Sequence, residues 1–339
     1  MKIGIANDLP LAVEALRSTI EAHSSHTICW IAQNGQQAID LCTLQCPDVL
    51  LMDVVMPGVD GVEATRRIMA KTPCAILVVT ADVGANAARV YEAMGAGALD
   101  AVDVPTLSGF SARRSVAMLM SKIDEIAAAR QATQSAAGAQ ASSAAQRDPH
   151  RDTTLLAIGA SAGGPAALAT ILARLPKTLD AATVIVQHVD AAFASGMADW
   201  LSQQSALPVR TAREGDRPER GVVLLAATDD HLRLKSADAL GYTRTPEQMP
   251  YRPSIDVFFQ SIVDLWPGRA VGLLLTGMGR DGATGLKAMR TKGHSTIAQD
   301  KATCAVYGMP KAAAEIGAAG SIVPLPKIAD ALVAAIARN

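Results

Sequence analysis

Aromatic residues and surplus charge are what this 339-residue sequence has least of. Phe, Trp and Tyr make up 3% of it, and 31 Lys and Arg residues stand against 32 Asp and Glu residues, a formal net charge of −1. A nucleic-acid partner is therefore not expected, because backbone binding needs excess cations and single-strand binding needs stacking rings. No helix-turn-helix pattern is present, which disfavours a transcription-factor output.

Long apolar runs and paired cysteines are missing as well. The longest apolar runs, such as residues 270–275, fall far short of the about 18 residues of a membrane span. Residues 1–8 are typical of a short strand ending in an acid, not of a cleavable signal. Five cysteines without a C-x-x-C spacing indicate neither a disulfide framework nor a zinc site. We therefore expect a soluble, cytoplasmic protein with no membrane insertion.

The length predicts about two domains, at roughly 150 residues per domain. Composition changes near Ala127, and from there to Gln146 the chain has a single charge and no aromatic or large aliphatic residue. Such a segment buries too little apolar surface to fold. We expect a flexible linker at residues 122–152, between domains at 1–121 and 153–339. Its alanine-rich start favours an extension of the preceding helix. The alternative to a flexible linker is a helix that lies on a domain surface.

Strands and helices alternate on both sides of this linker. Apolar runs predict strands in the first domain at residues 2–6, 27–32, 49–52, 75–79 and 98–102. Further runs predict strands in the second domain at residues 155–159, 183–187, 222–226, 270–276 and 296–298. Segments between them carry the helical period. The alternation predicts a doubly wound, flavodoxin-like parallel sheet in the first domain and a mostly parallel α/β layer in the second.

Three oxygen-bearing side chains lie where strands of the first domain end. Asp8 follows the first strand, Asp53 ends the third and Thr80 ends the fourth. These ends meet at one edge of a parallel sheet, where carboxylates suit Mg²⁺ and an Asp can attack phosphorus to give an acyl phosphate. A single strand-end Asp is more often a turn or cap residue. The set of three predicts a phosphate-handling site.

The first domain resembles the receiver domain of bacterial response regulators. The resemblance covers about residues 1–120 and is carried by Asn7-Asp8, the block from Met52 to Gly61, Thr80-Ala81 and Pro105. It implies that a histidine kinase phosphorylates Asp53. It also implies that Asp8, Asp53 and the carbonyl of Val55 hold Mg²⁺, and that Thr80 is the phosphate switch.

Three positions depart from that pattern. Asn7 stands where receivers carry a second acid, and Ala101 stands where they carry an aromatic switch. Val104 stands where they carry a Lys that bridges to the phosphoryl group. Asp103 is placed to restore the lost carboxylate, but no residue replaces the cation. The resemblance therefore implies phosphorylation at Asp53 with weakened coupling to the surface.

The second domain opens with a strand that runs into a glycine-rich turn. Residues 155–165 read LLAIGASAGGP and match G-x-S-x-G with Ser161 at the centre. Ser161 is expected to project beside free backbone N–H groups, which stabilise a developing oxyanion. Two alternatives stay open. The turn could be a phosphate cradle, although it lacks the Gly-Lys-Ser/Thr of a P-loop, or Ser161 could be a plain helix cap.

A base and an acid follow at later strand ends. His188 comes directly after the next predicted strand, 27 residues beyond Ser161, whereas the other histidines occupy helix ends, linker or turn-like contexts: His23, His26, His150, His231 and His294. Asp281 lies in a glycine-rich loop after the strand at 270–276 and would orient the imidazole. The order Ser, His, Asp differs from that of α/β-hydrolases. Together the three residues predict a serine hydrolase, with Asp256 as the next candidate acid.

The whole chain is similar to the chemotaxis-type protein-glutamate methylesterases, the CheB family, in which a linker joins a receiver to a catalytic domain. The resemblance spans nearly all 339 residues and is carried by residues 159–165, 186–188, 252–259 and 276–282. It implies that Ser161 is the nucleophile and His188 the general base and acid. It also implies that Asp281 orients the imidazole, that the N–H of Met278 is an oxyanion donor, and that catalysis needs no cofactor.

The resemblance also implies the partners. The substrate would be a glutamate methyl ester on the cytoplasmic helices of a methyl-accepting chemoreceptor, with deamidation of receptor glutamine as a second activity. The motifs at residues 5–8 and 100–105 are similar to those of the surface-sensing, Wsp-type branch. The alternative is a non-catalytic adaptor that binds receptor helices and holds phosphoryl groups, which the intact set of Ser161, His188 and Asp281 disfavours.

Overall fold

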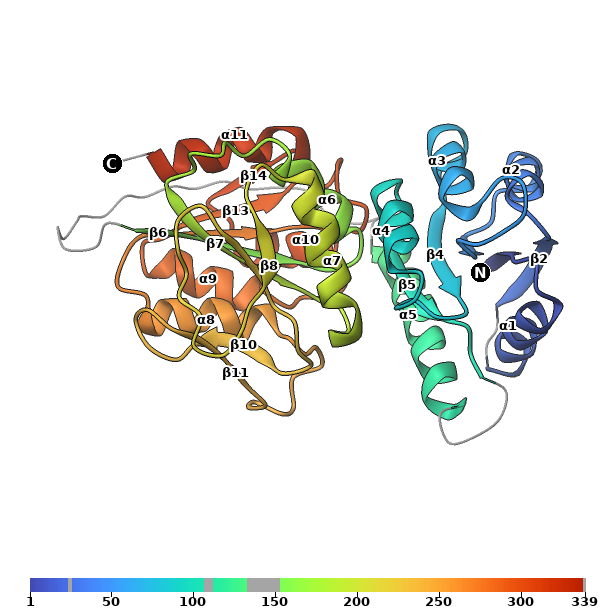
Figure 1. Ribbon diagram of the computed structural model, residues 1–339, viewed down its shortest axis with the longest axis horizontal. Coiled ribbons are helices and arrows are strands. Elements are labelled where there is room, and N and C mark those ends of the chain that lie inside the picture. Colours follow the sequence, from blue (N-terminus) through green and yellow to red (C-terminus); the bar gives the residue numbers. More distant parts are fainter. Residues whose placement is uncertain (24–25, 107–111, 133–152, 338–339) are drawn as a thin grey trace. The chain divides into compact units, whose positions relative to one another are not determined.

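The computed structural model describes residues 1–23, 26–106, 112–132 and 153–337 (Figure 1). The chain divides into two compact units, Met1–Gln134 and Ser135–Asn339. Within the described ranges, no helix combines the length and the apolar character that crossing a membrane demands.

The first unit has the predicted alternation of strands and helices. Its strands are β1 (Lys2–Ala6), β2 (Thr27–Ala32), β3 (Val49–Met52), β4 (Ala75–Thr80) and β5 (Asp100–Asp103). Its helices are α1 (Pro10–His23), α2 (Gly35–Leu44), α3 (Gly61–Lys71), α4 (Ala87–Gly95) and α5 (Ala112–Ala132). The strands pair in parallel in the order β2-β1-β3-β4-β5, which confirms the flavodoxin-like winding.

Helix α5 corrects one predicted boundary. It continues to Ala132, past residue 121, where we had expected the linker to begin. Ile123 and Ile126 are buried in the unit, and the alanine-rich sequence that follows has a high helix propensity. Apolar contacts and propensity therefore extend the helix. The rest of the predicted linker, residues 133–152, lies outside the described residues.

The second unit is built on one parallel sheet, in the order β14-β13-β12-β6-β7-β9-β8. Its strands are β6 (Thr154–Ala160), β7 (Ala181–Gln187), β8 (Val209–Thr211), β9 (Val223–Leu225), β12 (Ala270–Leu274), β13 (Ser295–Gln299) and β14 (Ser321–Val323). Strands β6 and β7 are buried along their whole length, as their continuous apolar sequences require in a sheet covered on both faces. The predicted parallel layer is confirmed.

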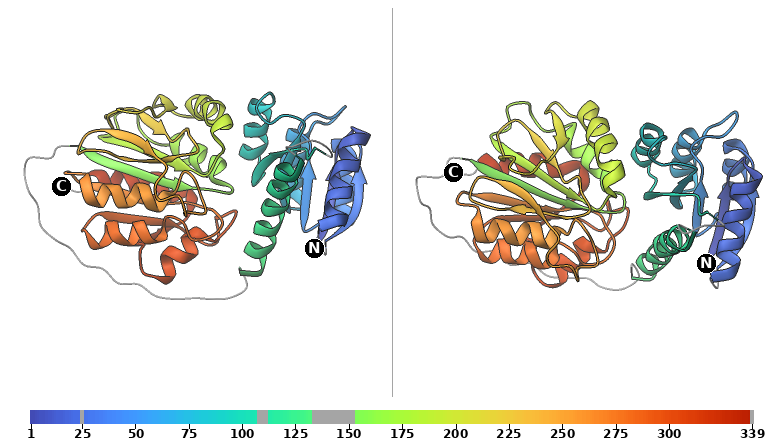
Figure 2. Two further views of the ribbon diagram at one scale, coloured as in Figure 1. Left: turned by 90° about the horizontal axis from the view of Figure 1, so that it is seen from below. Right: turned by 60° about the horizontal axis from the view of Figure 1, so that its bottom comes forward.

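Helices cover both faces of this sheet (Figure 2). On one face α6 (Gly164–Leu172) contacts α7 (Ala191–Gln204) and α11 (Leu325–Ala337). The other face carries α8 (Ile255–Leu265), α9 (Ala283–Thr291) and α10 (Met309–Glu315), with α9 in contact with both of its neighbours. Phe258 and Phe259 of α8 are fully buried in the core between helix and sheet.

An antiparallel hairpin was not predicted. Strand β10 (His231–Leu234) pairs with β11 (Leu240–Thr243), apart from the main sheet. Helix α8 contacts β10, and the hydroxyl of Ser261 accepts the N–H of Leu234 at 3.0 Å. Neither strand contains the continuous apolar run by which the strands of the two sheets were predicted, so the hairpin did not stand out in the sequence.

The direction of strand addition changes beside β6. The chain adds β7 on one side of β6, and β12 later pairs with its other side. Open parallel sheets bind ligands beyond the carboxyl ends of the strands at such a switch point. Ser161 follows β6 and the loop at residues 276–282 follows β12, so both predicted motifs meet there.

Candidate active site

Strand register brings Ser161 and His188 side by side. Each is the first residue after its strand, and the preceding residues, Ala160 and Gln187, are register partners in β6 and β7. The N–H of His188 donates to the carbonyl of Ala160 at 3.0 Å. Because neighbouring strands lie about 4.8 Å apart, the two residues are adjacent, as their spacing in the sequence predicted.

The backbone of Ser161 is fixed by three hydrogen bonds. Its N–H donates to the carbonyl of Thr276 at 3.1 Å, and its carbonyl accepts the N–H of Gly164 at 2.7 Å and Nε2 of Gln187 at 2.9 Å. Gly163 adopts φ +73°, which makes the sharp turn into α6 possible. Ser161 itself is 9% exposed. The strand, the turn and the helix start thus hold the serine at the edge of the sheet.

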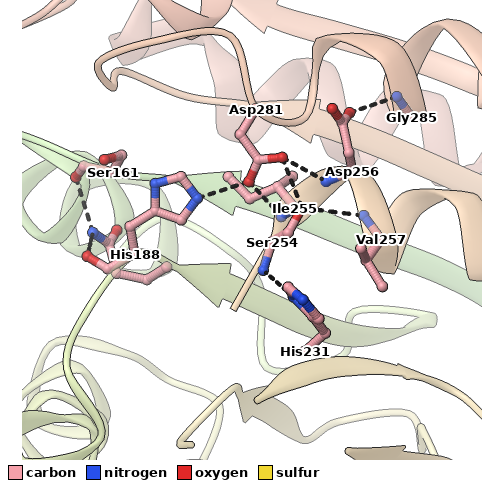
Figure 3. A network of polar contacts seen from close by, with 10 residues as sticks. Ser161, His188, His231, Ser254, Ile255, Asp256, Val257, Asp281 and Gly285 are labelled. Carbon is pink, nitrogen blue, oxygen red and sulfur yellow. Dashed lines mark hydrogen bonds and ion pairs between the residues drawn. The ribbon is translucent and has the colours of Figure 1, made fainter. Parts of the chain in front are cut away.

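The imidazole of His188 lies between Ser161 and Asp281 (Figure 3). Its Nε2 is 2.8 Å from Oδ2 of Asp281, and since an ionised carboxylate only accepts, Nε2 carries the proton. Nδ1, on the side of Ser161, is buried and has no hydrogen-bond partner in the part of the chain that the structure describes. In this tautomer Nδ1 has a free lone pair directed towards the serine, as a general base requires.

Asp281 is held at the N-terminus of α8. Its Oδ1 accepts the hydroxyl of Ser254 at 2.8 Å and the N–H of Asp256 at 3.1 Å, and Oδ2 accepts the N–H of Ile255 at 2.7 Å. Burial acts to raise the pKa of Asp281, but His188 and the two backbone N–H groups outweigh it and lower the pKa. The carboxylate therefore stays ionised and can stabilise an imidazolium.

Asp256, the next candidate acid, does not reach the imidazole. Its Oδ1 accepts the N–H of Gly285 at 2.6 Å, at the start of α9 and away from His188 (Figure 3). Burial, and secondarily the charge of Asp281, raises the pKa of Asp256 to about 6. The structure thus places Asp281, not Asp256, on His188.

His231 was missed as a member of this network. We had expected a turn-like context, which is wrong: it begins β10 and is fully buried. Its Nδ1 accepts the N–H of Ser254 at 3.0 Å (Figure 3). Its Nε2 lies 3.1 Å from the carbonyl of Pro246. His231 therefore fixes the segment that anchors Asp281. Nothing in the sequence indicated this, because β10 lacks the continuous apolar run that marked other strands.

The loop after β12 packs directly on the serine. A Cβ added to Gly277 would lie 2.7 Å from Cβ of Ser161 and 2.4 Å from Sδ of Met309, closer than real side chains approach. The N–H of Gly277 donates to the carbonyl of Val306, whereas the N–H of Met278 has no acceptor in the described part of the chain. A free N–H thus lies one residue from the contact with Ser161.

Asp53 of the first unit is surrounded by neutral donors. The N–H of Val55 donates to its Oδ1 at 3.2 Å, and Nδ2 of Asn7 donates to its Oδ2 at 3.1 Å. Oδ1 of Asn7 accepts the N–H of Leu9 at 2.8 Å, which fixes the orientation of the amide because an N–H only donates. Asn7 therefore presents a hydrogen-bond donor to Asp53 where receivers present an acid.

The residues around Asp53 still fit a divalent cation. Burial raises the pKa of Asp53, the N–H of Val55 and the hydroxyl of Thr80 offset part of this, and the charge of Asp8 raises the pKa further. Asp8 and Asp53 are thus close enough to repel each other. Two carboxylates and the carbonyl of Val55 suit Mg²⁺. Among the described residues no three His, Cys, Asp or Glu residues gather at a metal site, in keeping with Asn7 in place of an acid.

The other departures also have structural consequences. Asp103 accepts the N–H of Val83 at 2.8 Å, so one of its carboxylate oxygens is engaged with the loop after β4. The N–H of Val104 donates to the carbonyl of Thr80 at 2.9 Å. The hydroxyl of Thr80 accepts Nδ2 of Asn86 at 3.2 Å, at the N-terminus of α4. Thr80 therefore links Asp53 to the start of α4, through a residue that we had not predicted.

Comparisons with known proteins identify the family of each unit. One family model, CheB methylesterase, matches residues 156–332, and another, response regulator receiver domain, matches residues 3–106. The protein-glutamate methylesterase/protein-glutamine glutaminase 4 of Burkholderia thailandensis is 61% identical over 339 residues, which cover 100% of this chain and 98% of the relative. A relative of the same description from Burkholderia pseudomallei, numbered 2, is 60% identical over 342 residues, covering 100% and 98%.

A solved structure supports the fold of the second unit. The crystal structure of the Thermotoga maritima CheB methylesterase catalytic domain is 34% identical and has a TM-score of 0.52. The similarity covers 54% of this chain and 98% of that one.

Proposed function

Because the chain belongs to the CheB methylesterase family, we propose that it is a response regulator that hydrolyses glutamate methyl esters, and deamidates glutamine, on the cytoplasmic helices of a chemoreceptor. The observation that carries the proposal is the set of Ser161 directly after β6, His188 directly after β7 and Asp281 in the loop after β12, with the imidazole between the serine and the carboxylate. A non-catalytic adaptor has no need for an imidazole that bonds a buried carboxylate and turns a free nitrogen towards a serine. The place of action would be the cytoplasm.

We propose a proton path that this geometry supports. Nδ1 of His188 takes the proton of the Ser161 hydroxyl as Oγ attacks the ester carbonyl carbon, and the carbonyl electron pair moves onto oxygen. The N–H of Met278 is the proposed donor to that oxyanion. The imidazolium, stabilised by Asp281, then protonates the departing methoxide, and methanol leaves. Water, deprotonated by the same nitrogen, releases the acyl group as glutamate. For a glutamine substrate the leaving group is ammonia.

Control of the reaction belongs to the receiver. We propose that a histidine kinase transfers a phosphoryl group to Asp53 and that Thr80 responds to it. Asp8, Asp53 and the carbonyl of Val55 would hold Mg²⁺, which supplies positive charge to neutralise the phosphoryl oxygens when it is bound.

Methanol release from a methylated chemoreceptor, with and without acetyl phosphate, tests the proposed function. We expect release in both conditions, faster with the phosphodonor, and covalent labelling of Ser161 by a fluorophosphonate probe. An adaptor would bind the receptor but release no methanol and leave the probe unreacted.

Val104→Lys is expected to strengthen activation by acetyl phosphate about fivefold or more, at the low end of typical coupling between sites. The backbone of Val104 is bonded to Thr80, so a lysine there starts beside the switch residue, and its ammonium can attract the phosphoryl oxygens. Asp53→Asn should remove whatever activation exists. The ratio of methanol-release rates with and without the phosphodonor measures both effects.

A matched control for this charge is Thr106→Lys, which adds the same cation at an exposed position two residues further on. It should leave the activation ratio unchanged. If the wild-type protein is already activated as strongly as Val104→Lys, the missing cation does not limit coupling.

Gly277→Ala is expected to slow methanol release by about tenfold to a hundredfold. The added methyl group would overlap Ser161 and Met309, and a displacement of the nucleophile by about 1 Å costs about 10²-fold in rate. Gly320→Ala is the control, because its Cβ would have no neighbour closer than 3.1 Å. Thermal unfolding should show both variants folded, and a Gly277→Ala rate within twofold of the wild type would contradict the close packing.

A further inference from the structure

One face of the His188 imidazole is covered by an aromatic ring from another segment. The ring of Tyr251 is stacked on it with centroids 4.3 Å apart and planes 8° from parallel. We propose that Tyr251 is a positioning residue, which sets the plane of the imidazole so that Nδ1 faces Ser161. The inference rests on the proposed hydrolase function and adds a residue to the three that carry the chemistry.

The existing hydrogen bonds leave this plane underdetermined. Asp281 holds the ring at one point, through Nε2, and Nδ1 has no partner in the described part of the chain. A ring held at one edge can still tilt, and tilting would swing Nδ1 away from the serine. A parallel aromatic neighbour opposes tilting, because close stacking is lost as soon as the two planes separate.

Tyr251 is itself well placed to act as a fixed surface. A Cβ added to Gly279 would lie 3.0 Å from the Tyr251 hydroxyl oxygen, so the far end of the ring packs on the loop that also carries Asp281. Along the chain, Tyr251 lies three residues before Ser254, whose hydroxyl donates to Asp281. The segment that anchors the carboxylate therefore also supplies the ring.

The stack also suits the charge that His188 acquires during the reaction. An aromatic face attracts a cation lying over it, so it favours the imidazolium that forms when Ser161 gives up its proton. Two acidic residues belong to this network: Asp281, which is bonded at Nε2, and Asp256, whose N–H donates to Oδ1 of Asp281. Tyr251 adds to their effect without adding a charge that would compete for Nε2.

Four variants of the full-length protein test the proposal, compared with wild type and with Ser161→Ala. Tyr251→Phe and Tyr251→His keep a flat ring, whereas Tyr251→Leu and Tyr251→Met remove it at similar size. For each we would measure the rate of Ser161 labelling by a fluorophosphonate, kcat and KM for methanol release from methylated receptor, and the thermal unfolding midpoint.

The ring-bearing variants should label and turn over within about twofold of wild type. The leucine and methionine variants should lose about tenfold or more in both labelling rate and kcat with KM unchanged, since a slightly misplaced base costs up to about 10²-fold. Labelling needs no receptor, so its loss separates positioning of His188 from receptor binding.

Three results would overturn the proposal: a leucine variant that labels as fast as wild type, a phenylalanine variant as slow as leucine, or non-aromatic variants that do not fold. The first makes the ring dispensable, the second assigns the effect to the hydroxyl, and the third makes Tyr251 a stability residue. If wild type itself neither labels nor releases methanol, the proposed function fails instead.

Discussion

Ser161→Ala is expected to reduce methanol release from a methylated chemoreceptor by about 10⁴-fold to 10⁶-fold, the size of loss that follows removal of a triad nucleophile. The structure explains why the loss should fall on chemistry alone. The three hydrogen bonds that fix residue 161 use its N–H and carbonyl, which alanine retains, and the hydroxyl supports no other described group. Removing one oxygen atom from this turn therefore removes the attacking group and little else.

The measurement is initial-rate methanol release, with receptor binding and the unfolding midpoint recorded on the same preparation. Both of these should match the wild type. Ser236→Ala provides the control, since that serine is exposed in the turn between β10 and β11. Its hydroxyl donates to Asp238, and its N–H, which alanine retains, donates to the carbonyl of Ala239. A Ser161→Ala protein that keeps more than about a tenth of the activity would remove Ser161 from the mechanism.

Asp281→Asn should cost about 10⁴-fold in kcat, as it does in other triads. Three donors besides Nε2 of His188 converge on this carboxylate: the hydroxyl of Ser254 and the N–H groups of Ile255 and Asp256. An amide has one oxygen and one NH₂ group, so either orientation opposes a backbone N–H. When NH₂ takes the position of Oδ2, Nε2 must become an acceptor and the proton moves to Nδ1. The lone pair facing Ser161 is then lost.

The second acid of the site supplies the comparison for this variant. Asp256→Asn keeps an oxygen for the N–H of Gly285 and leaves the bond between His188 and Asp281 intact. We expect it to lose far less activity than Asp281→Asn in the same methanol-release assay. Near-normal turnover of Asp281→Asn together with inactivity of Asp256→Asn would transfer the orienting role to Asp256.

Features that depend on strand order could be predicted from the sequence. Apolar runs marked all five strands of the first sheet and five of the seven in the second, where the three-residue β8 and β14 were missed. The residues directly after two of these strands, Ser161 and His188, lie side by side because parallel register determines which ends meet. Asp281 followed from the same rule. Features that depend on tertiary contacts could not be predicted. His231 lies on a four-residue strand whose place is set by α8, and Tyr251 precedes Ser254 in a segment without any period.

The end of α5 and the orientation of the Asn7 amide also depend on contacts that the sequence does not show. Helix α5 passes the expected boundary because Ile123 and Ile126 are buried against the first unit and alanine extends the helix beyond them. At the receiver site the sequence shows that Asn7 replaces an acid, but not that its amide turns NH₂ towards Asp53. That orientation follows from the N–H of Leu9, two residues away. Because an N–H can only donate, it must face the amide oxygen of Asn7.

The register pairing of Ala160 with Gln187 has a consequence for enzyme engineering. Nδ1 is the ring nitrogen nearer to the backbone, so a histidine that works through it needs its serine at the end of the neighbouring strand and not across a wide cleft. Two parallel strands that end at the same level place the serine and the histidine at this short distance, and no specialised loop is needed. The serine–histidine half of this site should therefore be transplantable onto other parallel sheets. What a recipient scaffold must add is a helix N-terminus in line with the imidazole, because that is where the carboxylate is held.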